Sequence, residues 1–322
     1  MLDRLRHIIA DNQILIVLLA LVAGVLLPEV FRPLSPYGTP MLMVIFFTSS
    51  LRLDIKELWS YARDWKLLSV ANGIMLILMP LVMWFPLYLF APDWALAFLI
   101  VGAVPTGLTI ALIADLFGGN TALAMIISAT TSLLAPLTVP FVFWLVLRQQ
   151  IDIPVVSLFE SLFLTIVIPF ALAMLVKSRA KKAIEKHDLL WREISLVLFG
   201  LLVAGITADA VGESSISLGW NELGIVTLMI IFMGGVAWLA YELTSWRTPS
   251  ERVTVALCMV YMNNTLALYL GNRFFHDQNV VPKLLIILAA VNALLIPIKW
   301  GATKALAKEG RSRKQRVANP VI

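Results

Sequence analysis

Long runs of apolar residues, separated by short polar segments, dominate the chain. Most runs have the length of about 20 residues that an α-helix needs to cross the hydrocarbon core of a bilayer. The pattern predicts an all-α polytopic membrane protein with ten membrane-spanning helices. The spans are expected at about residues 13–29, 39–53, 66–91, 94–116, 121–147, 155–176, 191–211, 220–245, 249–271 and 281–307.

Composition supports a membrane protein over a soluble one. Of the 322 residues, 60% are hydrophobic and 14% are charged, and the mean hydropathy is +0.89. Soluble domains usually contain about 25% charged residues. The net charge of +5 comes from bases in the short segments between spans, so we expect no nucleic-acid partner.

The distribution of Lys and Arg predicts the orientation of the chain. With the N-terminus in the cytoplasm, 21 of these residues lie on the cytoplasmic side and 4 on the outer side. Positively charged residues are retained on the cytoplasmic side of membrane proteins. We therefore expect a multi-pass protein of the bacterial inner (plasma) membrane with both termini in the cytoplasm.

The ten predicted spans can be divided into two groups of five, and the polar segment 177–192 follows the sixth span. An odd number of spans in the first group inverts the second, as in the inverted repeats of many secondary transporters. We place a boundary at residue 176. Residues 1–176 then hold the first five-helix repeat and the sixth helix, and residues 177–322 hold helices 7–10 and a basic cytoplasmic tail.

Two corresponding spans contain residues that disturb a membrane helix. The fourth contains Pro105 and Gly107 within "VPTGLTIALIADLFGGN", and the ninth contains "YMNNTLAL", with Asn263 and Asn264. A broken helix exposes backbone groups that lipid cannot satisfy, and its N-terminal amides can bind an anion. Paired interruptions therefore indicate a binding site. The alternative is that these residues only pack one helix against another.

The same residues carry a resemblance to a known family. The stretch "VGAVPTGLTIALIADLFGGNTALAMIISATTSLLAPLTVP", together with "NNTLALYL" and Asn292, resembles the bile acid:sodium symporter family. The resemblance implies ten helices in a 5+5 inverted repeat with discontinuous fourth and ninth helices. Helices 1, 2, 6 and 7 would form a panel domain, and the others a core domain.

Members of this family move organic anions, usually with sodium. The resemblance therefore implies a secondary transporter that moves a small organic anion by alternating access, with the anion's carboxylate at the half-helix N-termini. No nucleophile–base pair or metal cluster suggests an enzyme, and no cofactor is expected. The residues expected to bind the substrate are Thr106, Gly107, Leu108, Thr109, Asn263, Asn264, Thr265 and Asn292.

The chain departs from the family where sodium is usually bound. Sodium is a hard cation that prefers oxygen ligands. At the family's ligand positions only Ser128 keeps a hydroxyl group, so we expect both sodium sites to be lost. The other positions carry Met75, Ile110, Ala111, Ala124, Cys258 and Met262.

The coupling ion and the oligomeric state stay open. Asp115 lies near the cytoplasmic end of the fourth span, about 15 Å along a helix from Pro105. Intramembrane carboxylates are candidates for function, so Asp115 would suit proton coupling; its alternative role is an ordinary interfacial group. A facilitative carrier, or a non-transporting membrane sensor that kept the fold, are further alternatives.

Overall fold

The computed structural model describes residues 13–53, 63–107, 109–148, 154–213, 219–275 and 279–291. Within these ranges every regular element is a helix, apart from an isolated antiparallel bridge between Thr106 and Met262. The expected all-α fold is therefore confirmed. Leu108 and Asn292, both expected in the binding site, lie outside the described residues.

The described helices have the following bounds in chain order. They are α2 (Gln13–Leu26), α3 (Pro28–Phe31), the 3₁₀ helix η1 (Arg32–Tyr37), α4 (Gly38–Ser50), α6 (Trp65–Gly73), the π-helical turn η2 (Ile74–Leu78), α7 (Met79–Phe90), α8 (Pro92–Ala103), α9 (Ile110–Leu116), α10 (Thr121–Leu147), α11 (Val155–Leu162), the π-helical turn η3 (Phe163–Val167), α12 (Ile168–Lys186), α13 (Asp188–Glu213), α14 (Trp220–Leu243), α15 (Pro249–Val260), α16 (Asn264–Phe274) and a last helix, Val281–Val291.

Several of these helices are candidates for crossing a membrane. Five are long and apolar enough on their own: Trp65–Phe90, Thr121–Leu147, Val155–Lys186, Asp188–Val211 and Trp220–Leu243. A sixth candidate is the pair Leu15–Leu26 and Pro28–Ser50, which is bent by 107°, and the helices Pro92–Ala103 and Val281–Val291 are shorter and apolar. The total of ten spans and the inverted repeat stay predictions.

The sixth span continues further than hydropathy indicates. Its helix was expected to end near residue 176, but α12 reaches Lys186 with a kink at Ala180, and α13 begins at Asp188. Hydropathy marks where apolar side chains stop. The chain beyond that point is rich in Lys, Ala and Glu, which favour helix in water as well.

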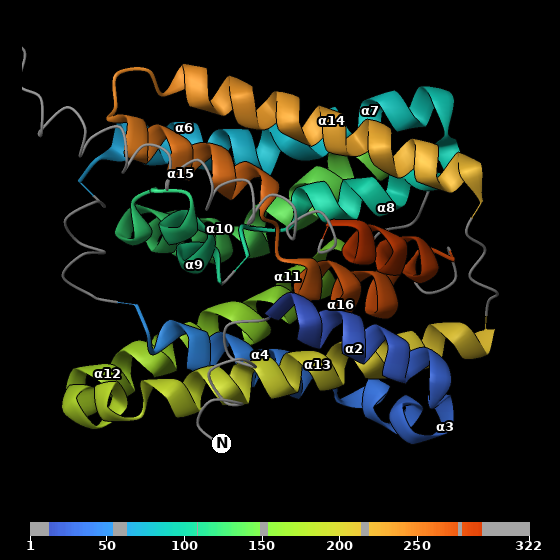
Figure 1. The fold of residues 1–322 in the computed structure, drawn as a ribbon, viewed down its shortest axis with the longest axis horizontal. Coiled ribbons are helices and arrows are strands. Elements are labelled where there is room, and N and C mark those ends of the chain that lie inside the picture. The colour runs from blue at the N-terminus through green and yellow to red at the C-terminus, as the bar shows by residue number, and fades with distance from the viewer. Residues whose placement is uncertain are drawn as a thin grey trace, which may run out of the picture.

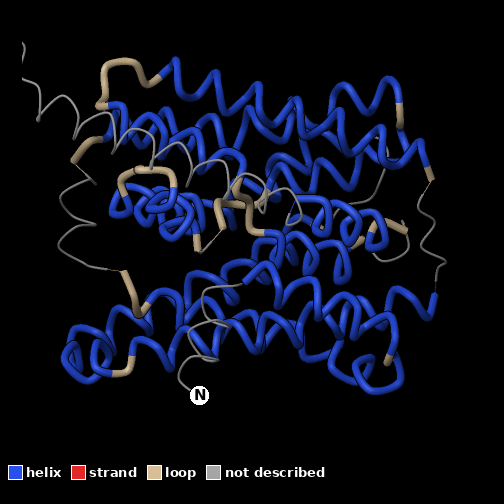
Figure 2. Tube along the Cα trace, in the orientation of Figure 1, coloured by secondary structure: helices blue, strands red, loops and turns tan. Residues whose placement is uncertain are grey.

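The helices form two bundles (Figures 1 and 2). In the first bundle, α13 packs along α2, α3 and α4, and α12 packs on α4. In the second bundle, α7 packs on α8, α14 on α15, and α10 on α9 and α15. The helix α11 contacts α10 and continues through η3 into α12, so it connects the bundles. Each bundle combines segments from both sides of residue 176. The boundary between the two halves of the chain that we place at this residue stays a prediction.

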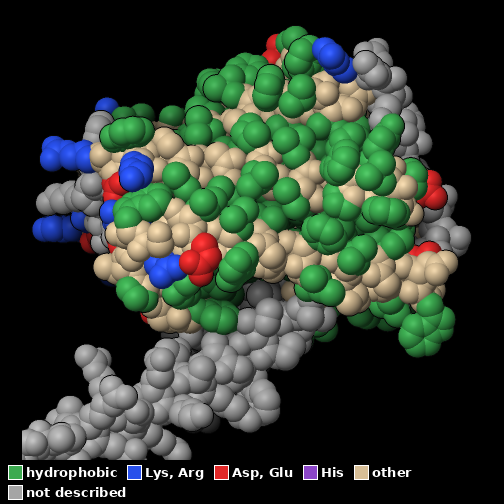
Figure 3. All heavy atoms as spheres, turned by 90° about the horizontal axis from the view of Figure 1, so that it is seen from above, with side chains coloured by type: hydrophobic (Ala, Val, Ile, Leu, Met, Phe, Trp, Pro, Cys, Tyr) green, Lys and Arg blue, Asp and Glu red, His purple; other side chains and the backbone are tan. Residues whose placement is uncertain are grey.

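The surface of the second bundle suits a lipid environment. Figure 3 shows a face that is hydrophobic over its middle, with charged side chains gathered toward its two ends. Large apolar side chains of α14, among them Leu228, Ile231 and Trp238, are exposed. Large exposed apolar areas are unusual for soluble monomers and are favourable in a bilayer.

Candidate functional site

The predicted fourth and ninth spans each contain a break in the helix, and the two breaks pair with each other. The described residues between α8 and α9, and the residues between α15 and α16, are not helical. The amide of Gly107 donates to the carbonyl of Tyr261 at 2.7 Å, and the amide of Asn263 donates to the carbonyl of Pro105 at 2.8 Å. Pro105 supplies no amide of its own. The breaks therefore satisfy each other's backbone groups, as a non-polar environment requires.

Hydroxyl groups stabilise the paired breaks through further hydrogen bonds. Thr106 is fully buried; its hydroxyl donates to the carbonyl of Cys258, and its amide donates to the hydroxyl of Thr131. Ser128 of α10 donates to the carbonyls of Thr106 and Gly107, each at 3.3 Å. These contacts tie α10 and α15 to the break in the fourth span.

Gly107 is required by a close approach between the breaks. A Cβ atom at this position would lie 2.7 Å from the ring of Tyr261. The hydroxyl of Tyr261 in turn shares a 2.7 Å hydrogen bond with the hydroxyl of Thr109. The absence of a side chain at Gly107 lets the Tyr261 ring fold over the break.

Asn263 has two roles at the start of α16. Its Oδ1 accepts from the amide of Leu266 at 3.1 Å and so caps the helix. Its Nδ2 is buried and has no hydrogen-bond partner among the described residues. The hydroxyl of Ser132, also buried, has none either. Because buried polar groups are normally paired, these two groups are candidates for contacts with a ligand.

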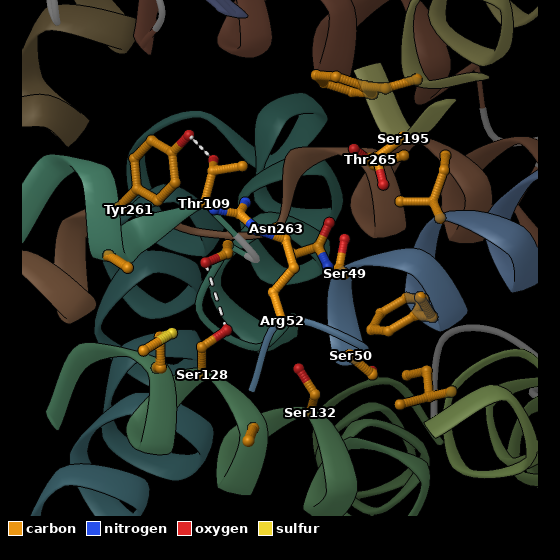
Figure 4. Close-up of a pocket in the computed structure, with 18 of the residues that line it drawn as sticks. Ser49, Ser50, Arg52, Thr109, Ser128, Ser132, Ser195, Tyr261, Asn263 and Thr265 are labelled. Carbon is orange, nitrogen blue, oxygen red and sulfur yellow. Dashed lines mark hydrogen bonds between the residues drawn. The ribbon is translucent and has the colours of Figure 1, made fainter. Parts of the chain in front are cut away.

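A cavity of about 120 Å³ lies beside the paired breaks, between the two bundles. One water needs about 10–15 Å³ of such space, so the cavity has room for several water molecules or a small ligand. Figure 4 shows Asn263 and Arg52 extending into it from different elements. The lining comes from α4, α9, α10, η3, α12, α13, α16, both breaks and Leu288.

The two sides of the cavity differ in polarity. The first bundle contributes most of the large apolar side chains: Ile45, Phe46, Ile166, Phe170, Leu196 and Phe199. The second bundle contributes most of the polar groups: Gly107, Thr109, Ser128, Ser132, Tyr261, Asn263, Asn264 and Thr265. The first bundle also supplies Ser49, Ser50, Ser195 and two cations, Arg52 and Arg192. Such a lining suits a ligand with an apolar body and polar or charged groups.

The structure brings most of the predicted binding residues together. Gly107, Thr109, Asn263, Asn264 and Thr265 all line the cavity. Thr106 does not line it; its hydroxyl faces α15 instead. Sequence reasoning missed the first-bundle side of the cavity. Ser49 and Ser50 resemble ordinary helix residues, and Arg52 and Arg192 were counted only as charges that orient the chain.

The positions at which the family usually binds sodium are apolar and mostly buried. Met75, Ile110, Ala124, Cys258 and Met262 all belong to the hydrophobic core around the breaks. Ala111 is partly exposed and lines the cavity. The hydroxyl of Ser128 serves the break. Within the described residues, no group of three or more His, Cys, Asp or Glu side chains could hold a metal ion.

Asp115 lies apart from the cavity. It is exposed near the end of α9, and the cavity lining does not include it. Its carbonyl accepts from Gly118, which has a φ of 67° in the turn before α10. No observation favours proton coupling through Asp115 over an interfacial role.

The helix α16 packs on α8 of the second bundle, and a second set of polar contacts joins it to the first bundle at the end of the molecule where α3 lies (Figure 1). The hydroxyl of Tyr269 in α16 hydrogen-bonds with Ser161 at 2.7 Å and with Thr39 at 3.1 Å. Asn272 donates to the hydroxyl of Ser35 at 3.3 Å, which donates to Asp209 at 2.8 Å. These contacts hold α16 against α4, η1 and α11.

Comparison with known proteins gives a consistent result. The model of the sodium bile acid symporter family matches residues 39–213, more than half of the chain. Sodium/bile acid cotransporter 7-B of Xenopus laevis is 26% identical over 285 residues, which cover 83% of this chain and 82% of the relative. An uncharacterized sodium-dependent transporter of Bacillus subtilis, YocS, is 27% identical over 270 residues, which cover 81% of each chain.

Proposed function

Because the chain belongs to the sodium bile acid symporter family, and is therefore a membrane transporter and not an enzyme, we propose that it moves a small organic anion across the bacterial inner membrane by alternating access. One observation carries the proposal. The cavity lies between two bundles and beside two broken helices that meet through their breaks. A site between bundles changes its access when one bundle moves against the other.

We propose that the described conformation is open to the cytoplasm. Arg52 and Arg192, which lie on the cytoplasmic side in the orientation expected from Lys and Arg, both line the cavity. The contacts of Tyr269 and Asn272 lie at the opposite end of the first bundle, and they join the two bundles there. The outer side is then the closed one.

We propose that transport does not use the family's two sodium ions. The relatives above are named for sodium, but apart from Ser128 the corresponding positions here carry thioether, thiol and alkyl groups, and all of these except Ala111 lie in a hydrophobic core. These groups supply no hard oxygen ligand. The substrate would then move alone or with another ion.

The test is uptake by the full chain in proteoliposomes. Vesicles are incubated with a panel of small carboxylic acids, and their contents are measured by mass spectrometry with a sodium gradient, a proton gradient or neither. We expect uptake of at least one acid at the same rate in sodium and potassium buffers. Uptake that sodium stimulates several-fold would contradict the loss of the sodium sites. Binding without uptake would contradict transport and point to a sensor.

A matched pair of variants controls for folding. Asn263→Ala removes the cap of α16 together with the unpaired Nδ2, whereas Thr248→Ala removes the cap of α15 away from the cavity. Loss of either cap destabilises the protein by about 1 kcal/mol. We expect only Asn263→Ala to lower uptake, by tenfold or more. Equal effects of the two variants would mean that Asn263 acts through helix stability alone.

A further inference from the structure

We propose that Arg52 and Arg192 bind the anionic group of the substrate and supply the positive charge that co-transported sodium would otherwise provide. The inference rests on the proposed function and places the carboxylate at the first bundle instead of at the half-helix N-termini of the second. It follows from three observations. The backbone amides at the breaks are already hydrogen-bonded, the charged side chains that line the cavity are arginines, and the side chains of Asn263 and Ser132 each keep a neutral donor without a partner in the described structure.

The backbone amides at the breaks are largely committed to the protein. Gly107 and Asn263 donate across the breaks, Ile110 donates to the carbonyl of Gly107, and Asn264 donates to that of Met262. The amide of Leu266 donates to the side chain of Asn263. An anion would have to displace these bonds before it could use the amides. In addition, α9 has only seven residues, so its dipole offers at most a fraction of a charge.

The full positive charges in the cavity lie on the opposite side. Arg52 follows the end of α4, and Arg192 lies near the start of α13. The residues lining the cavity include these two arginines and no Asp or Glu among the described part of the chain. A guanidinium group binds a carboxylate through two parallel hydrogen bonds, and such charge-assisted bonds are about twice as strong as neutral ones.

Arg52 is held in a way that leaves donors for a ligand. Its Nε donates to Asp188 at 3.1 Å, and both side chains are partly exposed. Among the described residues, the two Nη atoms of Arg52 have no partner. A single exposed ion pair of this kind contributes little to stability. The ion pair holds the guanidinium group through its Nε atom, and Arg52 lines the cavity.

The remaining unpaired groups suit the other end of the same ligand. The Nδ2 of Asn263 and the hydroxyl of Ser132 are neutral, buried and without partners in the described structure. A carbonyl or hydroxyl group of the substrate can accept from Asn263. A monocarboxylate with an apolar middle and one such group would therefore connect the arginines to the breaks across the apolar wall.

The fixed charge also accounts for the loss of the sodium ligands. An organic anion in a low-dielectric cavity needs a positive partner. In a sodium-coupled carrier, bound sodium can provide it. Here Arg52 and Arg192 provide it permanently. The negative charge of the substrate is therefore still neutralised when apolar side chains such as Cys258 and Met262 replace sodium ligands.

The test compares acids with their amides on the purified full chain. The probes are 6-hydroxyhexanoate, 4-oxopentanoate, 4-hydroxybenzoate and 4-hydroxyphenylacetate, each beside its primary amide, and the readout is the ligand-dependent shift of the thermal midpoint. We expect at least one acid to bind, with its amide at least tenfold weaker, and with the same affinity in sodium chloride and choline chloride. No binding by any of the acids would overturn the substrate class in the proposed function as well.

Variants then locate the carboxylate. Arg52→Gln and Arg192→Gln should each weaken binding of the acid by tenfold or more without changing that of the amide, and Arg52→Lys should keep part of the affinity. Arg179→Gln, an exposed base on α12 outside the cavity, is the matched control and should have no effect. Midpoints without ligand identify any variant that fails to fold. Wild-type affinity in folded Arg52→Gln and Arg192→Gln, with acid still preferred over amide, would overturn this proposal and leave the proposed function standing.

Discussion

At the scale of single residues, the site depends on small groups that let two segments of the chain approach each other closely. Gly107 accommodates the ring of Tyr261, and Asn263 replaces a missing backbone acceptor at the start of α16. Neither role is visible in hydropathy, because both residues look only like interruptions of an apolar run. Their function comes from what faces them across the break.

Gly107→Ala should destabilise the protein and lower transport. The added methyl group would lie 2.7–2.8 Å from the ring of Tyr261 and 3.2 Å from the carbonyl of Met262, so the breaks must move apart. Overpacking of this kind usually costs about 1–3 kcal/mol. The check is the thermal midpoint in detergent, measured together with uptake.

Gly234→Ala is the matched control for this change. Gly234 lies within α14, and a Cβ there would meet nothing within 4 Å. Alanine is favoured over glycine inside a helix by roughly 0.5–1 kcal/mol, so the midpoint should rise slightly or stay unchanged. Equal loss of stability in both variants would show that the close contact at Gly107 is unimportant.

At the scale of elements, the breaks divide two spans into halves with different tasks. The helix α15 begins at "TPSE" with a capping box in which Thr248 and Glu251 bond reciprocally. The helix α16 begins beside the cavity and ends at the contacts with α4 and η1. One half-helix thus joins the site to the end of the molecule that we propose to be closed.

Tyr269→Phe should shift the conformational equilibrium toward the outward-open state. The change removes the hydroxyl that bonds Ser161 and Thr39, and each bond contributes about 1 kcal/mol, so the loss of both should shift the equilibrium about thirtyfold. Labelling of a cysteine at Leu42, buried in α4 near Thr39, by an impermeant thiol reagent from outside would measure it. The background carries Cys258→Ala.

Tyr37→Phe provides the comparison for this experiment. Tyr37 is exposed, and its hydroxyl makes no hydrogen bond among the described residues, so labelling at residue 42 should not change. If Tyr269→Phe leaves labelling at the same low rate as Tyr37→Phe, the Tyr269 contact does not keep the outer side closed.

At the scale of the whole molecule, both bundles are needed for one site. Neither side of the cavity contains both the arginines and the unpaired donors. A ligand that contacts both bundles is exposed or enclosed according to how they meet. In the proposed alternating-access mechanism, transport therefore requires the two bundles to move relative to each other.

Joining the bundles covalently should therefore stop transport reversibly. Ser35 and Asn272 contact each other across the bundles, so Ser35→Cys with Asn272→Cys in a Cys258→Ala background allows cross-linking with a short bifunctional, reducible thiol reagent. We expect uptake to fall to the level of empty vesicles and to return after reduction. Each single cysteine treated in the same way should remain active. Full uptake by the cross-linked pair would exclude movement of the bundles at this contact.

The sequence alone determined the environment of the chain, its helical class and the two breaks. Long apolar runs have no stable alternative to helix in lipid, and Pro105 and the polar residues around Asn263 interrupt their runs in any conformation. The turn at Gly118 and the start of α15 followed from local preferences of a few residues. Five of the eight predicted binding residues line the cavity, because they lie at or next to the two breaks.

Only the tertiary structure decided what those breaks face. Arg52 and Arg192 are far from the breaks along the chain, and their spacing has no signature, because a base at the end of a span ordinarily serves orientation. The amide of Gly107, which was expected to bind the anion, is occupied by its hydrogen bond to the carbonyl of Tyr261. This bond likewise forms only because two segments about 150 residues apart in the chain meet. Contacts between distant segments follow from packing, which no local pattern of residues specifies.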